Sequence, residues 1–133
     1  MNNLFAYGSL MCADIFEMVT GGAIEAVDCC LHGYQRVAVK NESYPAVFQS
    51  ESSTVDGVLY RGISEPQFKL LDQFEGNMYI REQVTVLIND NEEKACVYAI
   101  HPGFTDCLTM NSWSFEYFLR HDKTGFINEY AGF

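Results

Sequence analysis

The stretch that decides the fold is Phe5-Ala6-Tyr7-Gly8-Ser9-Leu10, taken together with Leu71-Asp72-Gln73-Phe74-Glu75-Gly76. The first segment is a short apolar strand that runs into a Gly-Ser turn, and the backbone N–H groups of such a turn can hold a carboxylate or an oxyanion. The second segment is the end of an amphipathic helix that carries a carboxylate within its apolar stripe. An anion cradle and a half-buried acid together indicate an enzyme that acts on a small zwitterionic molecule.

Outward from these segments, alternating apolar residues and turn signals predict a strand-rich chain. We expect strands at residues 4–7, 23–31, 34–40, 46–49, 55–62, 79–88 and 94–100. We expect helices after Met11 (ended by Gly21-Gly22), from Ser64 to about Glu75, from Ser112 to about Arg120, and around Phe126, Ile127 and Tyr130. The pattern predicts an α+β fold, a small mixed, mostly antiparallel β-barrel of six to seven strands flanked by helices. No linker divides the chain, so residues 1–133 are expected to form a single domain.

Local signals sharpen these elements. Ser64 and Gln67 have the spacing of a capping box at the start of the middle helix. Gly57, inside an expected strand, is expected to mark a β-bulge. The inward-facing side chains of the C-terminal helix are expected to be Phe115, Phe118 and Leu119.

Composition excludes several classes of partner. The net charge is −10, from 8 basic and 18 acidic residues, which argues against nucleic acid, since phosphate binding needs clustered Lys and Arg. No apolar run is long enough to span a membrane, and residues 1–5 lack the features of a signal peptide. Five cysteines, with Cys29 and Cys30 adjacent, are typical of reduced thiols in a cytoplasmic protein. No Cys or His spacing indicates a metal site.

Glu75 is the first candidate for chemistry. At 100° per residue it projects from the same stripe as Phe68 and Leu71, so we expect partial desolvation to raise its pKa toward neutral pH. A carboxyl group tuned in this way can transfer protons. The alternative is a structural carboxylate at a helix end, held by Arg81 or Lys69.

The turn at residues 7–10 is the second candidate. Gly8 is expected to allow a backbone conformation that other residues resist, so that Ser9 and Leu10 aim their N–H groups into one concavity. No Lys follows, which excludes a Walker loop. The alternative is an ordinary strand-to-helix turn. Tyr44-Pro45 likewise reads as a pocket wall or as a rigid loop.

Two weaker candidates complete the set. Cys12 follows the turn and could serve as a nucleophile if His32 or His101 approached it, but a buried thiol is the alternative. Asp72 lies nearer the edge of the apolar stripe, so we interpret it as a solvated or supporting carboxylate.

In their order along the chain, six segments resemble the gamma-glutamylcyclotransferase-like family. They are Phe5 to Leu10, Tyr34-Gln35-Arg36, Tyr44-Pro45-Ala46-Val47, Asp56 to Tyr60, Leu70 to Gly76 with Tyr79-Ile80-Arg81, and Ala95 to Tyr98. The branch they look like is that of the gamma-glutamylamine cyclotransferases and the plant avirulence-induced proteins. The similarity spans about residues 4–100, with a looser match in the C-terminal helix.

The resemblance implies a small mixed barrel and a cofactor-independent, metal-free reaction. The α-amine of a small γ-glutamyl amide attacks its own γ-carbonyl, which releases 5-oxoproline and a free amine or amino acid. The matched residues are Glu75 as general acid/base and Tyr7, Gly8, Ser9, Leu10, Tyr44, Pro45 and Tyr79 as substrate-binding residues. Ser9, where Thr is also common, and Asn77-Met78 depart from the pattern, so the leaving group stays open.

A second hypothesis belongs to another functional class. It is a non-catalytic module on the same fold that binds a carboxylate ligand or a protein through the cradle. The sequence is compatible with a monomer or a homodimer.

Overall fold

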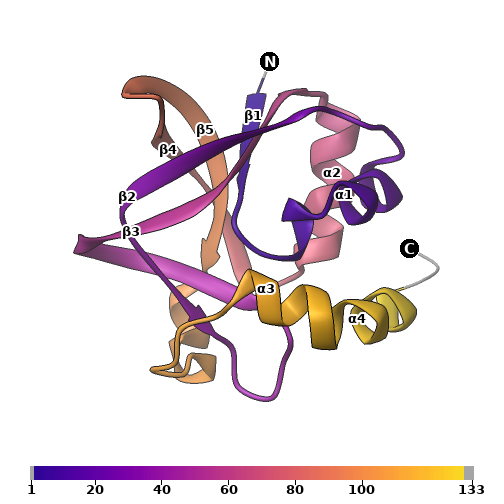
Figure 1. Cartoon of the computed structure of the whole chain (residues 1–133), viewed down its shortest axis with the longest axis vertical. Helices are drawn as coiled ribbons and strands as arrows, with labels where there is room; N and C mark the ends of the chain where they lie inside the picture. Colours follow the sequence, from indigo (N-terminus) through magenta and orange to yellow (C-terminus); the bar gives the residue numbers. More distant parts are fainter. Residues whose placement is uncertain (1, 131–133) are drawn as a thin grey trace.

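Five strands close into a barrel in the computed structural model, which describes residues 2–130 (Figure 1). The strands are β1 (Asn2–Ala6), β2 (Ala26–Ala38), β3 (Pro45–Ile63), β4 (Tyr79–Ile88) and β5 (Asn91–Ile100), and their order around the barrel is β1-β3-β2-β4-β5. Neighbouring strands are antiparallel except β1 and β5, which pair in parallel at Leu4 and Cys96. The predicted α+β class and the mixed, mostly antiparallel barrel are therefore confirmed.

The predicted count of six to seven strands is wrong, because two pairs of expected strands are each one continuous strand. β2 runs through Gly33, whose φ of 86° takes up a register shift between His32 and Tyr34 without ending the strand. On β3 the partners jump from Thr54 to Gln49, so the residues between them bulge out of the ladder. Polar and glycine residues here mark a bulge rather than a strand end.

The β4–β5 hairpin forms where the sequence predicts a turn. Asn89 and Asp90 have φ values of 49° and 69°. A two-residue hairpin turn of type I′ requires such a pair of residues with positive φ. β5 begins at Asn91, three residues earlier than expected, because the turn needs only two residues.

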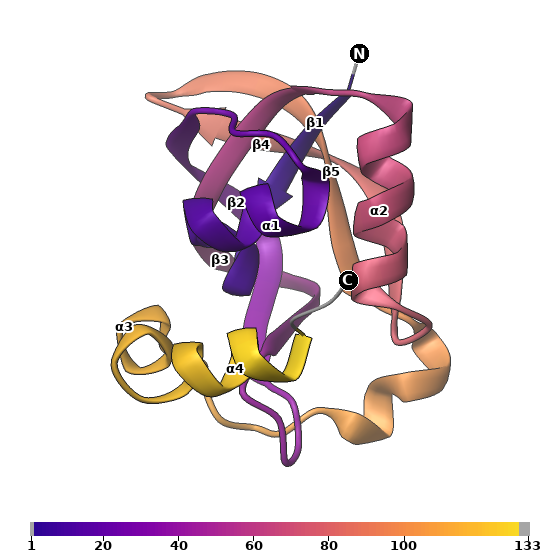
Figure 2. The same cartoon turned by 90° about the vertical axis from the view of Figure 1, so that its right-hand side faces the viewer.

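Helices cover one side and one end of the barrel (Figures 1 and 2). They are η1 (Ser9–Met11), α1 (Ala13–Thr20), α2 (Glu65–Glu75), η2 (Pro102–Cys107), α3 (Phe115–Tyr117), the π-helical turn η3 (Phe118–Asp122) and α4 (Lys123–Tyr130). Ser64 and Gln67 form the predicted capping box of α2. None of the helices within residues 2–130 has the length and apolar character needed to cross a bilayer.

The C-terminal helices differ from the two expected at residues 112–120 and around Phe126, because α3, η3 and α4 follow one another without a break from Phe115 to Tyr130. Phe118 is fully buried and Phe115 packs against the core, as predicted, but Leu119 is 43% exposed, so the prediction for Leu119 is wrong. A π-helical turn begins at Phe118, so the segment does not keep one helical period beyond that residue. Phe126 on α4 is buried instead, at 3% exposure.

Strand β1 separates two parts of the core. Leu4 and Ala6 point toward the helices, where they join a cluster with Phe16 of α1 and Leu71 of α2. Phe5 and Tyr7, which is two residues further along, point into the barrel. This alternation follows from the two-residue period of a strand. It places the loop after β1 at the junction of barrel and helices.

At Gly57 the backbone of β3 lies very close to strand β1. The predicted bulge at Gly57 is wrong, since it pairs with Cys29 in unbroken register. A Cβ atom at Gly57 would lie 2.3 Å from the Ala6 carbonyl oxygen and 2.8 Å from Phe5 Cζ. Glycine is therefore required for space against β1.

We expect Gly57→Ala to lower the free energy of unfolding by about 1–3 kcal/mol, the usual cost of overpacking a core. Gly125→Ala on α4 is the matched control, because nothing lies within 4 Å of its Cβ position and alanine favours a helix. Chemical denaturation of both variants checks this. Equal stability of the two variants would contradict the close approach.

Candidate active site

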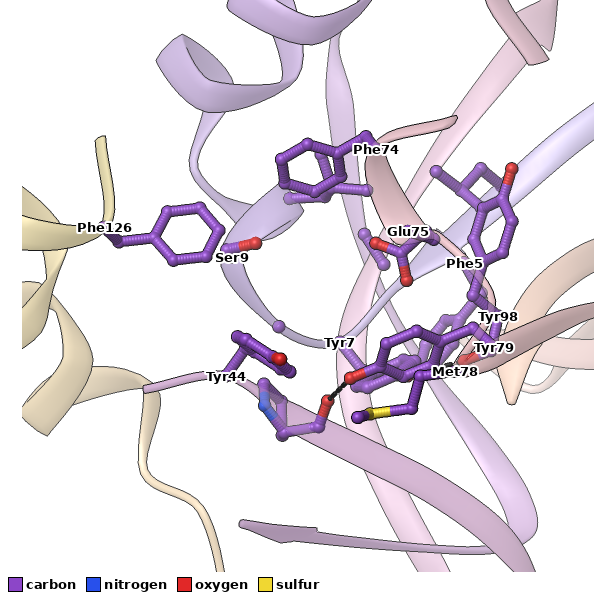
Figure 3. A pocket seen from close by; sticks show the side chains of 15 residues that line it. Phe5, Tyr7, Ser9, Tyr44, Phe74, Glu75, Met78, Tyr79, Tyr98 and Phe126 are labelled. Carbon is purple, nitrogen blue, oxygen red and sulfur yellow. Dashed lines mark hydrogen bonds between the residues drawn. The ribbon is translucent and has the colours of Figure 1, made fainter. Parts of the chain in front are cut away.

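A pocket opens where the loop after β1 meets the end of α2 (Figure 3). Its cavity volume is about 80 Å³, several times what one water requires and therefore room for a small organic molecule. The lining residues are Leu4, Phe5, Ala6, Tyr7, Gly8, Ser9, Leu10, Tyr44, Pro45, Phe74, Glu75, Met78, Tyr79, Tyr98 and Phe126. All eight residues that the sequence singled out for the site line this one pocket.

Tyrosines aside, Glu75 is the only described residue of the pocket lining that carries an ionisable acid or base. It is the last residue of α2, and Phe68 and Leu71 on the same stripe are buried, so the helix turns its carboxyl group inward. The side chain keeps partial exposure through the pocket mouth, while protein atoms surround the carboxyl group. Desolvation, followed by the negative charge of Asp72, raises the pKa of Glu75 to about 8.

The geometry does not place Glu75 in a structural ion pair. Arg81 lies 3.5 Å from Asp72 Oδ1 and stacks over the Phe68 ring at 4.5 Å. Lys69 is exposed. No ion pair or hydrogen bond of the Glu75 carboxyl group occurs within the described part of the chain. The carboxyl group therefore faces the cavity instead of a cation.

A set of tyrosine hydrogen bonds frames the acid. Tyr98 OH donates to Asp72 Oδ1 at 2.7 Å, and Tyr7 OH donates to the Tyr98 carbonyl oxygen at 2.5 Å. Burial raises the pKa of both phenols, with the nearby Glu75 charge acting in the same direction. Both phenols therefore stay neutral around Glu75. Asp72, the expected solvated or supporting carboxylate, is exposed and holds this frame from outside.

The loop at residues 7–10 has its carbonyl groups engaged on one side. The Tyr7 oxygen accepts from Arg36 Nη1 at 2.8 Å, and the Gly8 and Ser9 oxygens accept from the N–H groups of Met11 and Cys12 at 3.0 Å. The peptide bonds are trans, so each carbonyl points opposite to the N–H of the next residue. The N–H groups of Gly8, Ser9 and Leu10 consequently turn away from these partners, in a segment that lines the pocket.

Gly8 is required for a different reason than the sequence suggests. Its φ is −129°, which lies outside the left-handed region that favours glycine. A Cβ atom would instead lie 2.9 Å from Pro45 Cδ. Pro45 is held in turn by Tyr79 OH, which donates to its carbonyl oxygen at 2.8 Å (Figure 3). The loop and the Tyr44-Pro45 wall therefore touch directly.

Sequence reasoning missed several residues of the pocket. Tyr98 is one of the alternating side chains of strand β5, and Phe74 immediately precedes Glu75 on α2. Met78 belongs to Asn77-Met78, where the sequence departs from the family pattern. Phe126 had only its helical position as a signal, because the sequence does not show which side of α4 meets the barrel. These are the aromatic and apolar parts of the wall.

Cys12 is not arranged as a nucleophile. It is 5% exposed, and burial raises the pKa of its thiol to about 11. His32 Nδ1 lies 2.8 Å from Thr54 Oγ1, and His101 Nδ1 accepts from the N–H of Gly103, so neither imidazole serves Cys12. The buried-thiol interpretation fits this geometry.

The comparisons with known proteins now identify the family. Residues 4–115 match the family described as "Gamma-glutamyl cyclotransferase, AIG2-like". The chain belongs to this family. Two similar proteins of Arabidopsis thaliana are AIG2-like protein C, 30% identical over 126 residues (94% of this chain, 73% of the relative), and Protein AIG2 C, 32% identical over 116 residues (86% and 70%). Membership of the γ-glutamyl cyclotransferase, AIG2-like family indicates a cyclotransferase-type enzyme.

Solved structures of the same fold agree. A solution structure from Arabidopsis thaliana superposes with a TM-score of 0.75 at 27% identity, covering 97% of this chain and 79% of that one. A structure named Gamma-glutamyl cyclotransferase gives a TM-score of 0.66 at 19% identity, over 75% and 66%. An AIG2-like protein from Mus musculus gives 0.59 at 18%, over 86% and 88%. The last two, at this identity, support the fold alone.

We expect the stability of the protein to depend on pH through Glu75. Its pKa is about 8 when folded and near the ordinary 4.5 when unfolded, so between these values only the unfolded chain loses the proton. Stability therefore falls as pH rises from about 4.5 to 8. Glu75→Gln removes this loss, so its melting temperature should exceed that of the parent by an amount that grows with pH.

Melting curves from pH 4 to 9 measure this difference. Glu17→Gln is the control, because it makes the same change on an exposed carboxyl group of α1. A constant difference between Glu75→Gln and the parent at all pH values would contradict the burial of the acid.

Proposed function

We propose that this protein is a γ-glutamyl cyclotransferase that converts a small γ-glutamyl amide into 5-oxoproline and a free amine or amino acid. The observation that carries the proposal is the Glu75 carboxyl group, which faces a small pocket with its pKa raised to about 8. Membership of the γ-glutamyl cyclotransferase family supports the reaction type. A carboxyl group with this pKa can both accept and donate a proton near neutral pH.

Glu75 acts in both halves of the reaction. The substrate arrives with its α-amine protonated, and ionised Glu75 removes that proton so that the nitrogen lone pair can attack the γ-carbonyl carbon. The C–N bond of the five-membered ring forms, and the carbonyl π electrons move to oxygen. Protonated Glu75 then donates to the amide nitrogen, the carbonyl re-forms, and the amine leaves. The ring nitrogen gives up its second proton to Glu75, which passes it to the departing amine as that amine becomes an ammonium ion, so that 5-oxoproline is neutral at nitrogen and Glu75 is ionised again.

The loop at residues 8–10 handles negative charge. The N–H groups of this loop turn away from the donors that hold its carbonyl oxygens, in the segment that lines the pocket. We assign these N–H groups to the α-carboxylate or to the oxyanion that develops on the γ-carbonyl oxygen. Tyr7 and Tyr79 shape the floor beside Glu75, and Tyr44 with Pro45 forms the facing wall. Holding the glutamyl chain in a folded shape supplies a further share of the rate.

A non-catalytic module that binds a carboxylate or a protein on the same fold remains the second candidate. The cradle at residues 8–10 fits it as well. A raised pKa at an acid in a pocket favours the enzyme, since a plain carboxylate-binding site has no use for a desolvated carboxyl group beside the ligand. Thermal stabilisation by γ-glutamyl compounds without turnover would support the binding module.

We expect purified protein to release 5-oxoproline, detected by mass spectrometry, from at least one member of a γ-glutamyl panel. The panel contains γ-glutamyl amino acids, γ-glutamyl-ε-lysine, γ-glutamyl alkylamines and glutathione. Glu75→Gln should keep the fold and lower the rate by at least 100-fold, the lower range for loss of a general acid/base. Glu17→Gln and Cys12→Ala should retain activity; full activity of Glu75→Gln would sink the assignment of the base.

The pH profile tests how Glu75 is tuned. Ionised Glu75 is the base, so kcat/KM should rise about tenfold per pH unit on the acid side and level off near pH 8. The Asp72 charge raises the pKa of Glu75, and Asp72→Asn keeps an acceptor for Tyr98 while removing that charge. The acid limb should therefore move to lower pH in Asp72→Asn. An unmoved limb would show that another group sets the profile.

A further inference from the structure

The end of the pocket opposite Glu75 is aromatic. Phe74 and Phe126 meet edge to face, with ring centroids 6.0 Å apart at 72°, and Figure 3 shows Phe126 across the cavity from Glu75. Apart from Glu75, no Asp, Glu, Lys, Arg or His side chain lines the pocket within residues 2–130. This end therefore offers mainly apolar contact, with Ser9 and Tyr44 as its polar neighbours and no charged partner among the described lining residues.

Phe126 belongs to a segment outside the range that the family match covers. The matched residues end at 115, whereas Phe126 lies on α4. The structure named Gamma-glutamyl cyclotransferase covers 75% of this chain, but the plant solution structure covers 97%. The part of the pocket wall that Phe126 provides thus lies outside the barrel and outside the residues that match the family.

The position of Phe126 is fixed by its surroundings. Its ring is 5.5 Å from that of Phe118, which is fully buried. Lys123, one turn earlier, forms a 2.9 Å ion pair with Asp14 of α1. Phe126 itself is 3% exposed. The ring is a preformed part of the wall.

The reaction chemistry decides which part of a substrate meets this wall. Under the proposed function, on which this inference rests, Glu75 must reach both the α-amine and the amide nitrogen. Of the two roles assigned to the N–H groups of residues 8–10, we take here that of holding the α-carboxylate, because the described lining has no cation for it and the aromatic end is mainly apolar. The group left for the aromatic end is the substituent on the leaving nitrogen.

We propose that Phe126 is a specificity-determining residue that packs against the substituent on the leaving nitrogen, and that the preferred substrates are γ-glutamyl amides whose leaving amine carries an uncharged apolar group. A leaving group with its own carboxylate finds no cation among the lining residues that the structure describes, and it meets a chain of net charge −10. Desolvating that carboxylate against Phe74 and Phe126 is unfavourable.

Turnover of three amides tests the preference. They are γ-glutamyl-benzylamide, γ-glutamyl-methylamide and γ-glutamylglycine, which separate the effect of an aromatic group from that of a carboxylate. The parent should favour benzylamide in kcat/KM by about tenfold over each of the others, the scale of one good apolar contact. In Phe126→Ala the benzyl-to-methyl ratio should fall about tenfold, while the pH midpoint stays unchanged.

Two further variants separate recognition from stability. Phe126→Leu keeps an apolar wall, and it should fold like the parent with an intermediate ratio. Leu119→Ala, an exposed change in the same segment, should leave the ratio at the parent value. A benzyl-to-methyl ratio in Phe126→Ala and Phe126→Leu equal to that of the parent would overturn the assignment.

Binding without turnover separates this inference from the proposed function. The benzyl and methyl monoamides of glutaric acid lack the α-amine and cannot cyclise, so calorimetry gives their Kd values directly. The parent should bind the benzyl compound about tenfold more tightly, and Phe126→Ala should lose that difference. If no amide yields 5-oxoproline, the proposed function fails, yet this Kd ratio still tests Phe126. Equal Kd values in the parent, or no binding of either compound, would overturn the role of Phe126.

Discussion

The structure depends on the burial of strand β1 from both sides. Leu4, Phe5, Ala6 and Tyr7 are all at most 6% exposed, with alternate residues packed against the helices and inside the barrel. The same strand closes the barrel by pairing with both β3 and β5. Because β1 cannot move without opening both halves of the core, the loop that follows it is held in one place.

That placement explains how the fold supports an unfavourable acid. Asp72 and Glu75 lie one helical turn apart on α2, yet their surroundings differ. Asp72 stays near solvent with Arg81 and Tyr98 as partners, whereas Glu75 is desolvated at the cavity. Active sites commonly hold such a group at the expense of stability, which the surrounding core offsets. Here the offset comes from Phe68 and Leu71 on the same helix face.

The sequence was sufficient for the fold class, the helix that carries Glu75 and the residues gathered in the pocket. The helix rests on local rules, such as the helical period around Phe68 and Leu71 and the capping box at Ser64, whereas the full set of pocket residues rests on the resemblance to the gamma-glutamylcyclotransferase-like family. It was insufficient wherever long-range contact decides. The need for glycine at positions 8 and 57 comes from Pro45 and β1, and neither neighbour is evident from local sequence.

The same reason explains the error at the C-terminal helix. Periodicity assigned Leu119 inward and gave no role to the side of α4 that meets the pocket, because the sequence does not show which side of each helix meets the barrel. Only the packing of Phe126 against Phe118 and Phe74 reveals that role.

Arg36 also bears on how the molecule assembles. Its guanidinium bonds the Tyr7 carbonyl oxygen and lies over the ring of Trp113, whose Nε1 donates to the Ser43 carbonyl oxygen. One side chain thus joins the first loop, the loop before β3 and the segment leading to α3, which are distant in sequence. Contacts of such wide separation carry a large loop-closure cost. The pocket is therefore complete only when the whole barrel and its C-terminal helices have docked, and a ligand that binds it selects the fully assembled state.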